Sequence, residues 1–245
     1  MYDKNIPMKK ILFITMVLLL MIAHVSFAGF LDNLLKDIGI SSPKGLDDKT
    51  VISGLKEALS IGTEKAVDTV SQVDGYLANE AIRILMPENI QKVADILSKV
   101  GYQKEVDAFV ESMNHAAEKA APEATTHFIN AIKGMTFEDA KQILNGGDTA
   151  ATDYFRDKTS DNLYGTFKPV ISSSMDKVGV TKSYKDMMNK YLALPFVKEE
   201  SLDLDHYVTN KSLDGLFYMI AEEEKKIRTD PAARVTDLLK TVFSK

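Results

Sequence analysis

The chain is 245 residues long, carries 30 basic and 35 acidic side chains, and contains no cysteine. Its net charge of −5 and the lack of a long basic run argue against nucleic-acid binding, which requires neutralisation of phosphates. Without cysteine the chain can form neither disulfides nor the acylated-cysteine anchor of a lipoprotein. Stability must therefore come from apolar burial, which a chain of this length with 45% hydrophobic residues can supply.

Residues 1–28 show the three parts of a secretory signal peptide, namely a basic start, an apolar run from Ile11 to Ala23, and a Ser-x-Ala end at Ala28. We predict cleavage after Ala28 and export, with the periplasm of a Gram-negative bacterium as the destination. The alternative is an uncleaved anchor, because residues 11–28 form 18 mostly apolar positions, the lower limit for a membrane span. Cleavage removes three lysines and one aspartate, which changes the net charge from −5 to −7.

Hydrophobic periodicity predicts helices almost everywhere after the signal segment, and the alternation typical of strands is essentially absent. The predicted fold is all-α, a single-domain irregular helical bundle of about eight to ten helices over residues 46–245, preceded by an N-terminal arm over 29–45. No fixed-period repeat or low-complexity linker divides this bundle. No second apolar run reaches transmembrane length.

In the first half, apolar spacing predicts a long helix that begins at Asp47 or Asp48 and contains Gly54 and Gly62. Glycine within a helix costs on the order of 1 kcal/mol, so these two indicate close packing or a kink. Residues 71–87 are the least periodic stretch. Further apolar stripes predict helices over 90–100, 106–117 and 128–132, with Gly101, Pro122 and Gly134 marking ends or a kink.

A glycine pair at 146–147 separates the next two helix-like runs. Before it, Thr136 with Asp139 three residues on resembles a capping box, although Asp replaces the usual Glu or Gln. We predict that the glycines adopt left-handed conformations that reverse the chain, and that Asp148 caps the following helix. A phosphate cradle would leave those helix-start amides free and would add the Lys and Ser or Thr of a P-loop, so a turn is favoured over an anion site.

In the second half, the pattern predicts separate helices over 154–163 and 167–175, a short helix over 184–192, a charged loop over 195–203, a long helix over 204–227 with Asp203 as N-cap, and a last helix opened by Asp230-Pro231.

The charged stretch 221–237 is predicted to form mostly surface ion pairs four residues apart, namely Glu222 with Lys226, Glu224 with Arg228, and Asp230 with Arg234. One carboxylate is harder to place, because either Glu223 or Glu224 fills a gap in the apolar stripe of the long helix. A buried carboxylate must be paired or carry a raised pKa. A structural ion pair with one of the arginines is favoured over an acid that contacts a ligand.

Two sets of residues are candidates for a site. A polar set could line a cleft at helix ends: Asn114, Asp139, Asp148, Arg156, Glu223 and Arg228. An apolar set could line a ligand cavity, although core packing is the default interpretation: Phe109, Tyr154, Phe155, Phe217 and Met219. The histidines show no metal-ligand spacing and no GxSxG motif is present, so we predict no metal, no cofactor and no catalytic residue.

Four ordered blocks complete the pattern: GLKEALSIGTEKAV at 54–67, MNHAAEKAAPEA at 113–124, MTFEDAKQILNGGDTAATDYFRDKT at 135–159, and LDGLFYMIAEEEKKIRTDPAARVTDLLKTVF at 213–243. Together they resemble the bacterial family catalogued as domain of unknown function 4197, from about residue 46 to the end of the chain. The resemblance implies an exported, all-helical, single-domain protein. It implies no activity and no catalytic residues.

These features favour an exported, non-enzymatic helical protein that binds an apolar or amphiphilic small molecule or an envelope protein partner. Two alternatives stay open. One is an enzyme of unknown reaction with a polar cleft at helix ends. The other is a structural or assembly protein of the cell envelope, which a large exposed apolar patch would favour.

Overall fold

The computed structural model describes residues 48–178, 180–194 and 203–242. Within these ranges every regular element is a helix and no strand occurs, which confirms the predicted all-α fold. The predicted signal peptide, the arm and most of the charged loop lie outside the described residues. The elements are α3 (Asp48–Ser71), α4 (Glu88–Lys99), α5 (Gln103–Ala120), the 3-10 helix η1 (Ala121–Glu123), α6 (Ala124–Gly134), α7 (Phe137–Asn145), α8 (Ala150–Val178), α9 (Val180–Leu192), α10 (Leu204–Thr229), the 3-10 helix η2 (Pro231–Ala233) and α11 (Asp237–Val242).

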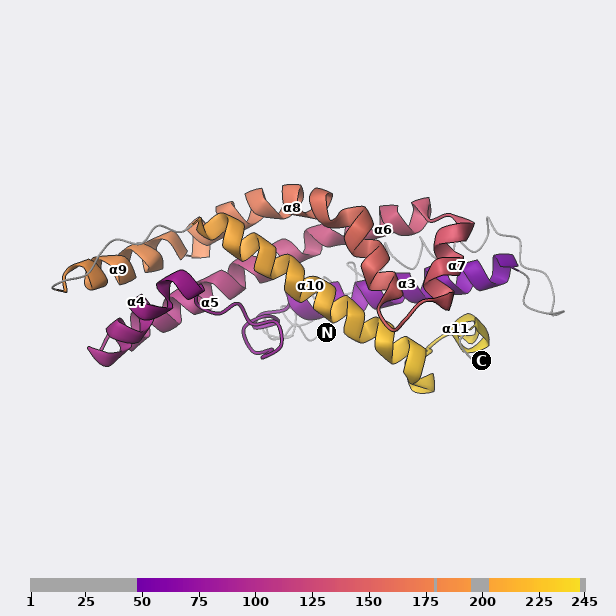
Figure 1. Cartoon of the computed structure of the whole chain (residues 1–245), viewed down its shortest axis with the longest axis horizontal. Helices are drawn as coiled ribbons and strands as arrows, with labels where there is room; N and C mark the ends of the chain where they lie inside the picture. Colours follow the sequence, from indigo (N-terminus) through magenta and orange to yellow (C-terminus); the bar gives the residue numbers. More distant parts are fainter. Residues whose placement is uncertain (1–47, 179, 195–202, 243–245) are drawn as a thin grey trace, which may run out of the picture.

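The long helices give the molecule an elongated shape, with α4 and α9 at one end and α7 and α11 toward the other (Figure 1). Helix α8 packs against α10, α5, α6 and α7, while α3 packs against α10, α6 and α11. Helices from both ends of the described chain therefore contact one another. Over the described ranges, no helix combines the length and the apolar character that crossing a membrane requires.

The core is built around Phe128 of α6. Its ring meets those of Phe155 in α8 and Phe217 in α10 edge-on, with centroids 5.3 and 6.2 Å apart. Such pairs contribute about 0.5–1.5 kcal/mol each beyond the burial of their area. On α5, Ala116 and Ala117 are fully buried, and their small side chains let the neighbouring helices approach closely.

Several helices begin or end at the capping residues that the sequence predicted. Thr136 and Asp139 form the predicted capping box at the start of α7, and the hydrogen bonds from the Thr136 backbone and hydroxyl lower the pKa of Asp139. The side chain of Asp203 accepts a hydrogen bond from the backbone N–H of His206 at 3.0 Å and caps α10 as predicted. Gly101, just past the end of α4, has a φ of 95°.

The turn between α7 and α8 forms at the glycine pair, but two details of its prediction are wrong. Neither Gly146 nor Gly147 has a positive φ, and Gly146 is extended at φ −83° and ψ −178°. Space is what requires a glycine here, because a Cβ on Gly146 would lie 2.5 Å from the Cβ of Ala150. Asp148 is exposed and does not cap α8, whose first amides are instead bound by Glu224 of α10.

The predicted break between residues 163 and 167 is also wrong, because α8 continues from Ala150 to Val178 with Pro169 inside it. Proline lacks an N–H, and its ring crowds the carbonyl of the residue four positions earlier. That residue is Gly165, where an added Cβ would meet no atom within 4 Å. The open surroundings and the missing side chain give the backbone room to accommodate the ring.

Candidate functional site

The carboxylate that the sequence places on the apolar face of α10 belongs to Glu224, which is 8% exposed. Arg228, one turn further along, donates hydrogen bonds to its Oε1 from Nε at 3.0 Å and from Nη2 at 2.9 Å. At the start of α8, the N–H groups of Ala151 and Thr152 each donate to the carboxylate at 2.9 Å. Arg228 Nη2 also donates to the carbonyl of Ile143 in α7 at 2.8 Å. The pair therefore joins α10 to α7 and α8, as a structural ion pair does.

The other polar candidates take part in separate contacts. Arg156 lies 4.5 Å above the ring of Phe217 and 3.7 Å from the carboxylate of Asp214. Glu223 accepts a hydrogen bond from Lys226 at 2.6 Å, in place of the predicted pair between Lys226 and Glu222. The two aspartates of the set lie in the helix cap and the turn described above. Apart from neighbouring residues on α10, the structure does not gather this set around one feature.

The apolar candidates belong mainly to the core. Phe109, Phe155 and Phe217 are fully buried, while Tyr154 and Met219 are half-buried. The Tyr154 hydroxyl donates to the carbonyl of Ala131 at 3.1 Å, and the Met219 sulfur accepts from the Asn79 amide at 3.5 Å. A cavity of about 20 Å³ lies between α3, α8 and α10, and Phe155 is the member of the set that lines it. A space of this size accommodates about one water molecule.

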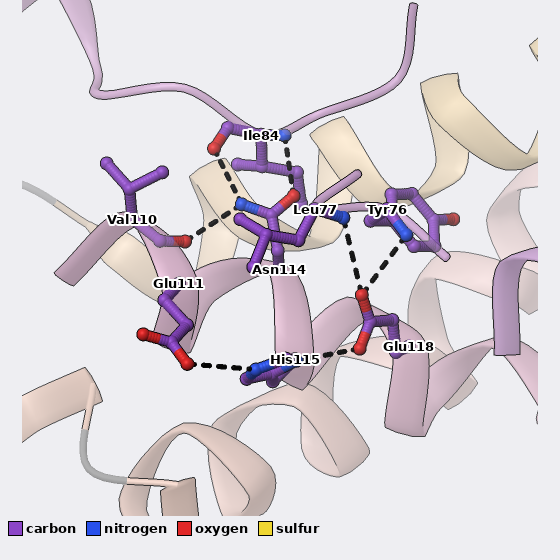
Figure 2. Close-up of polar contacts among 8 residues, drawn as sticks. All are labelled: Tyr76, Leu77, Ile84, Val110, Glu111, Asn114, His115 and Glu118. Atoms are coloured by element: carbon purple, nitrogen blue, oxygen red, sulfur yellow. Dashed lines mark hydrogen bonds and ion pairs between the residues drawn. The ribbon is translucent and has the colours of Figure 1, made fainter. Parts of the chain in front are cut away.

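A second polar feature lies on α5, which holds the irregular connection of residues 72–87 between α3 and α4 (Figure 2). Asn114 is fully buried, and its Oδ1 accepts from the N–H of Ile84 at 2.8 Å. Its Nδ2 donates to the carbonyls of Ile84 at 2.9 Å and Val110 at 2.8 Å. The amide thereby pairs both backbone groups of Ile84, as a neighbouring strand would.

Glu118 holds the start of the same connection one turn further along α5 (Figure 2). Its Oε1 accepts from the N–H groups of Tyr76 at 3.1 Å and Leu77 at 3.4 Å. Its Oε2 lies 2.8 Å from Nδ1 of His115, whose Nε2 is 3.4 Å from Glu111. Burial by itself lowers the pKa of His115, but the hydrogen bonds and charges of the two glutamates raise it above its ordinary value.

Helix α10 fixes the connection from its other side. The Tyr76 hydroxyl donates to the carbonyl of Ser212 at 2.7 Å, and the Tyr207 hydroxyl donates to the carbonyl of Leu85 at 3.0 Å. Gly215 lets the two segments approach, because a Cβ there would lie 2.7 Å from Cε1 of Tyr76. An irregular segment in a helical protein is thus anchored by side chains from two long helices.

The end of this connection borders a surface groove of about 870 Å³. Burial alternates along the segment: Arg83 is exposed, Ile84 is 1% exposed, Leu85 is 61% exposed and Met86 is 7% exposed. This period of two is that of an extended chain. The groove is lined by Arg83, Leu85, Met86, Pro87 and Glu88 on one side and by Tyr207 and Lys211 of α10 on the other.

The groove combines apolar surface with two cations. Neither Arg83 nor Lys211 forms an ion pair within the described part of the chain. The one acid of the lining, Glu88, lies in the first turn of α4, where the helix dipole favours a negative charge. Burial, and then the charge of Glu88, raise the pKa of Tyr207, so its hydroxyl stays neutral and donates to Leu85.

This groove was not predicted from the sequence. Residues 71–87 are the least periodic stretch of the chain, and the end of that stretch forms one wall of the groove. The available signal was that Tyr207 and Lys211 lie four residues apart, on one face of the long helix. Leu85 stands between apolar neighbours, so nothing in the sequence distinguished its exposed side chain from the buried Ile84 and Met86.

The described residues contain no group of three His, Asp or Glu side chains arranged to hold a metal ion. No curated protein and no solved structure matches the chain. A family model does match, over residues 45–244, and its description is "Protein of unknown function (DUF4197)". This range covers most of the chain and includes the groove and all the helices described above. The chain belongs to this family, as the sequence resemblance indicated.

Proposed function

We propose that this protein is an exported, non-enzymatic binding protein of the periplasm, and that its groove docks a segment of another envelope protein. The observation that carries the proposal is the anchored segment around Leu85. Asn114 and Tyr207 hold its backbone in place, while the Leu85 side chain stays 61% exposed beside α10. Because such a partly apolar surface is already held in place before binding, little conformational entropy is lost when a partner binds to it.

The sizes and positions of the internal cavity and the surface groove favour docking of a protein over binding of a small apolar ligand. The cavity inside the bundle, about 20 Å³, is far below the 300–1,000 Å³ or so that ligand pockets occupy. The groove is of that larger size but lies at the surface. The aromatic side chains that could have received a ligand contact one another in the core instead.

Binding is favoured over catalysis by the partners of the polar side chains. Asn114 uses both ends of its amide on backbone groups, and Glu224 accepts from α8 and from Arg228. Asp139 is part of a helix cap. Asn114 and Glu224 join separate segments and Asp139 stabilises the start of one helix, so all three groups have structural roles.

Site-specific photocrosslinking in intact cells of the native host tests the docking site. A photoreactive amino acid replaces Leu85 in one variant and Val235, which is 57% exposed and does not line the groove, in the matched control. We expect a discrete adduct of defined mass from position 85, and none from position 235. Equal adducts at both positions, or none at 85, would remove the support for the groove.

The mass of the protein recovered from the periplasmic fraction tests export. The expected mass is that of a chain beginning at Gly29, after loss of residues 1–28. Recovery of the full-length chain in the membrane fraction would instead assign an uncleaved anchor.

A further inference from the structure

The groove has a chemical preference that goes beyond docking as such. We propose that it takes an extended peptide segment bearing a carboxylate, which lies along residues 83–86 as an added strand and pairs its negative charge with Arg83 and Lys211. This inference rests on the proposed function, because it specifies the partner of the same groove.

The backbone of the anchored segment has one side in use and one side partly open. Both polar groups of Ile84 are bonded to Asn114 on the α5 side. In an extended chain the groups of Arg83 and Leu85 point the opposite way. The Leu85 carbonyl is bonded to Tyr207, but the Leu85 N–H and the Arg83 carbonyl form no hydrogen bond with the described residues.

Those two free groups flank Ile84 and are a donor and an acceptor that a neighbouring strand can use. Peptide recognition by strand addition draws its affinity from such main-chain bonds and its specificity from the side chains beside them. Because Leu85 projects from the same segment, an apolar side chain of the peptide gains a contact there.

The charge preference follows from the side chains that line the groove. The chain as a whole has a net charge of −5, yet the groove presents two cations without ion-pair partners in the described ranges. Glu88 neutralises one of these two cations only in part, because its carboxylate lies in the first turn of α4 and also interacts with the positive end of that helix dipole. An acidic side chain or a C-terminal carboxylate on the peptide is therefore favoured over a basic one.

The test uses a display library of random heptapeptides, selected on the mature chain of residues 29–245. We expect retained peptides to carry Asp, Glu or a free C-terminus at a constant position. Replacing Arg83→Gln or Lys211→Gln should weaken their binding by roughly 2- to 5-fold each, the range of exposed ion pairs, and added salt should weaken it further. Lys225→Gln, an exposed cation on the same helix α10 outside the groove, is the matched control.

Charge reversal makes the test sharper, because it predicts a gain. The double variant Arg83→Glu with Lys211→Glu should select peptides rich in Lys and Arg. Both positions are exposed, so unchanged melting temperatures are expected and confirm that the variants fold. A swap of peptide charge with the charge of the groove supports the inference directly.

Three other results would overturn it. The first is a set of peptides that bind the wild-type protein but not the Leu85→Ser variant, and that show no preference for acidic residues or do not change charge when the groove charge is reversed. That result would refute the charge preference and leave docking in the groove intact. Absence of any peptide that depends on Leu85 would refute both. Charge-dependent binding to phosphatidylglycerol vesicles, without any selected peptide, would assign the groove to a membrane surface.

Discussion

Replacing Glu224 by Gln removes the charge that joins α10 to α7 and α8 while keeping the size of the side chain. The carboxylate accepts hydrogen bonds from Ala151 N–H, Thr152 N–H, the Thr152 hydroxyl, and Arg228 Nε and Nη2. An amide offers only one oxygen, so its NH₂ group must face donors in either orientation. The less unfavourable orientation points it at Thr152, whose hydroxyl can turn but whose N–H cannot.

The expected loss of stability follows from that count. One buried N–H left without an acceptor costs about 1–3 kcal/mol. Arg228, only 14% exposed in its side chain, also loses its negative partner. We expect these two losses together to lower the free energy of unfolding by about 3 kcal/mol. For a chain of this size, that decrease lowers Tm by roughly 6–12 °C.

Thermal unfolding followed by circular dichroism measures this difference, with Glu223→Gln as the matched control on the same helix. The Glu223 side chain is 13% exposed, but it accepts its hydrogen bond from Lys226, which is 55% exposed, and not from a buried backbone N–H, so that change should lower stability less than Glu224→Gln does. If Glu224→Gln melts at the wild-type temperature, or if the two variants lose equal stability, the reasoning about the buried pair is wrong.

Four further substitutions can be followed by the same melting assay. Gly215→Ala should lower Tm, because its Cβ overlaps the buried Tyr76, whereas Gly62→Ala, with only ordinary contacts at 3.7 and 3.8 Å, should raise stability by up to about 1 kcal/mol. Glu57→Gln should raise Tm at neutral pH, because burial raises the pKa of Glu57, against a smaller opposing effect of the Thr236 hydrogen bond, and the charged form is therefore disfavoured in the folded state. The stabilisation by His115, whose pKa is raised, is complete below about pH 6.5 and lost as pH rises through the folded-state pKa, so His115→Gln should lower Tm more in acid than in alkali.

The parts of the fold that the sequence predicted correctly are governed by neighbouring residues. The capping box at Thr136, the N-cap at Asp203 and the end of α4 just before Gly101 each depend on contacts within a few positions. Helical periodicity likewise follows from local spacing of apolar side chains. The all-α fold was therefore predictable, and so was the presence of one buried carboxylate on α10.

Two other features depend on contacts between residues far apart in the sequence. From the sequence, Asp148 was expected to accept hydrogen bonds from the amides at the start of α8. In the structure Glu224, which is 72 residues from Thr152 in the sequence, accepts them instead. Asn114 was predicted as a candidate site residue because it is polar, yet what it binds is the backbone of Ile84, 30 residues away. A groove formed by two segments this far apart leaves no periodic signal in either of them.

The most direct test of docking in the groove is amide hydrogen exchange, resolved by residue with NMR, on residues 29–245 with and without a selected heptapeptide. We predict that the Leu85 N–H, which has no hydrogen-bond partner among the described residues, exchanges quickly and slows by about tenfold or more when the peptide binds. The Ile84 N–H, already bonded to Asn114, should be protected in both states. A bound peptide that leaves Leu85 exchange unchanged, or protects only amides away from residues 83–88, would contradict the account.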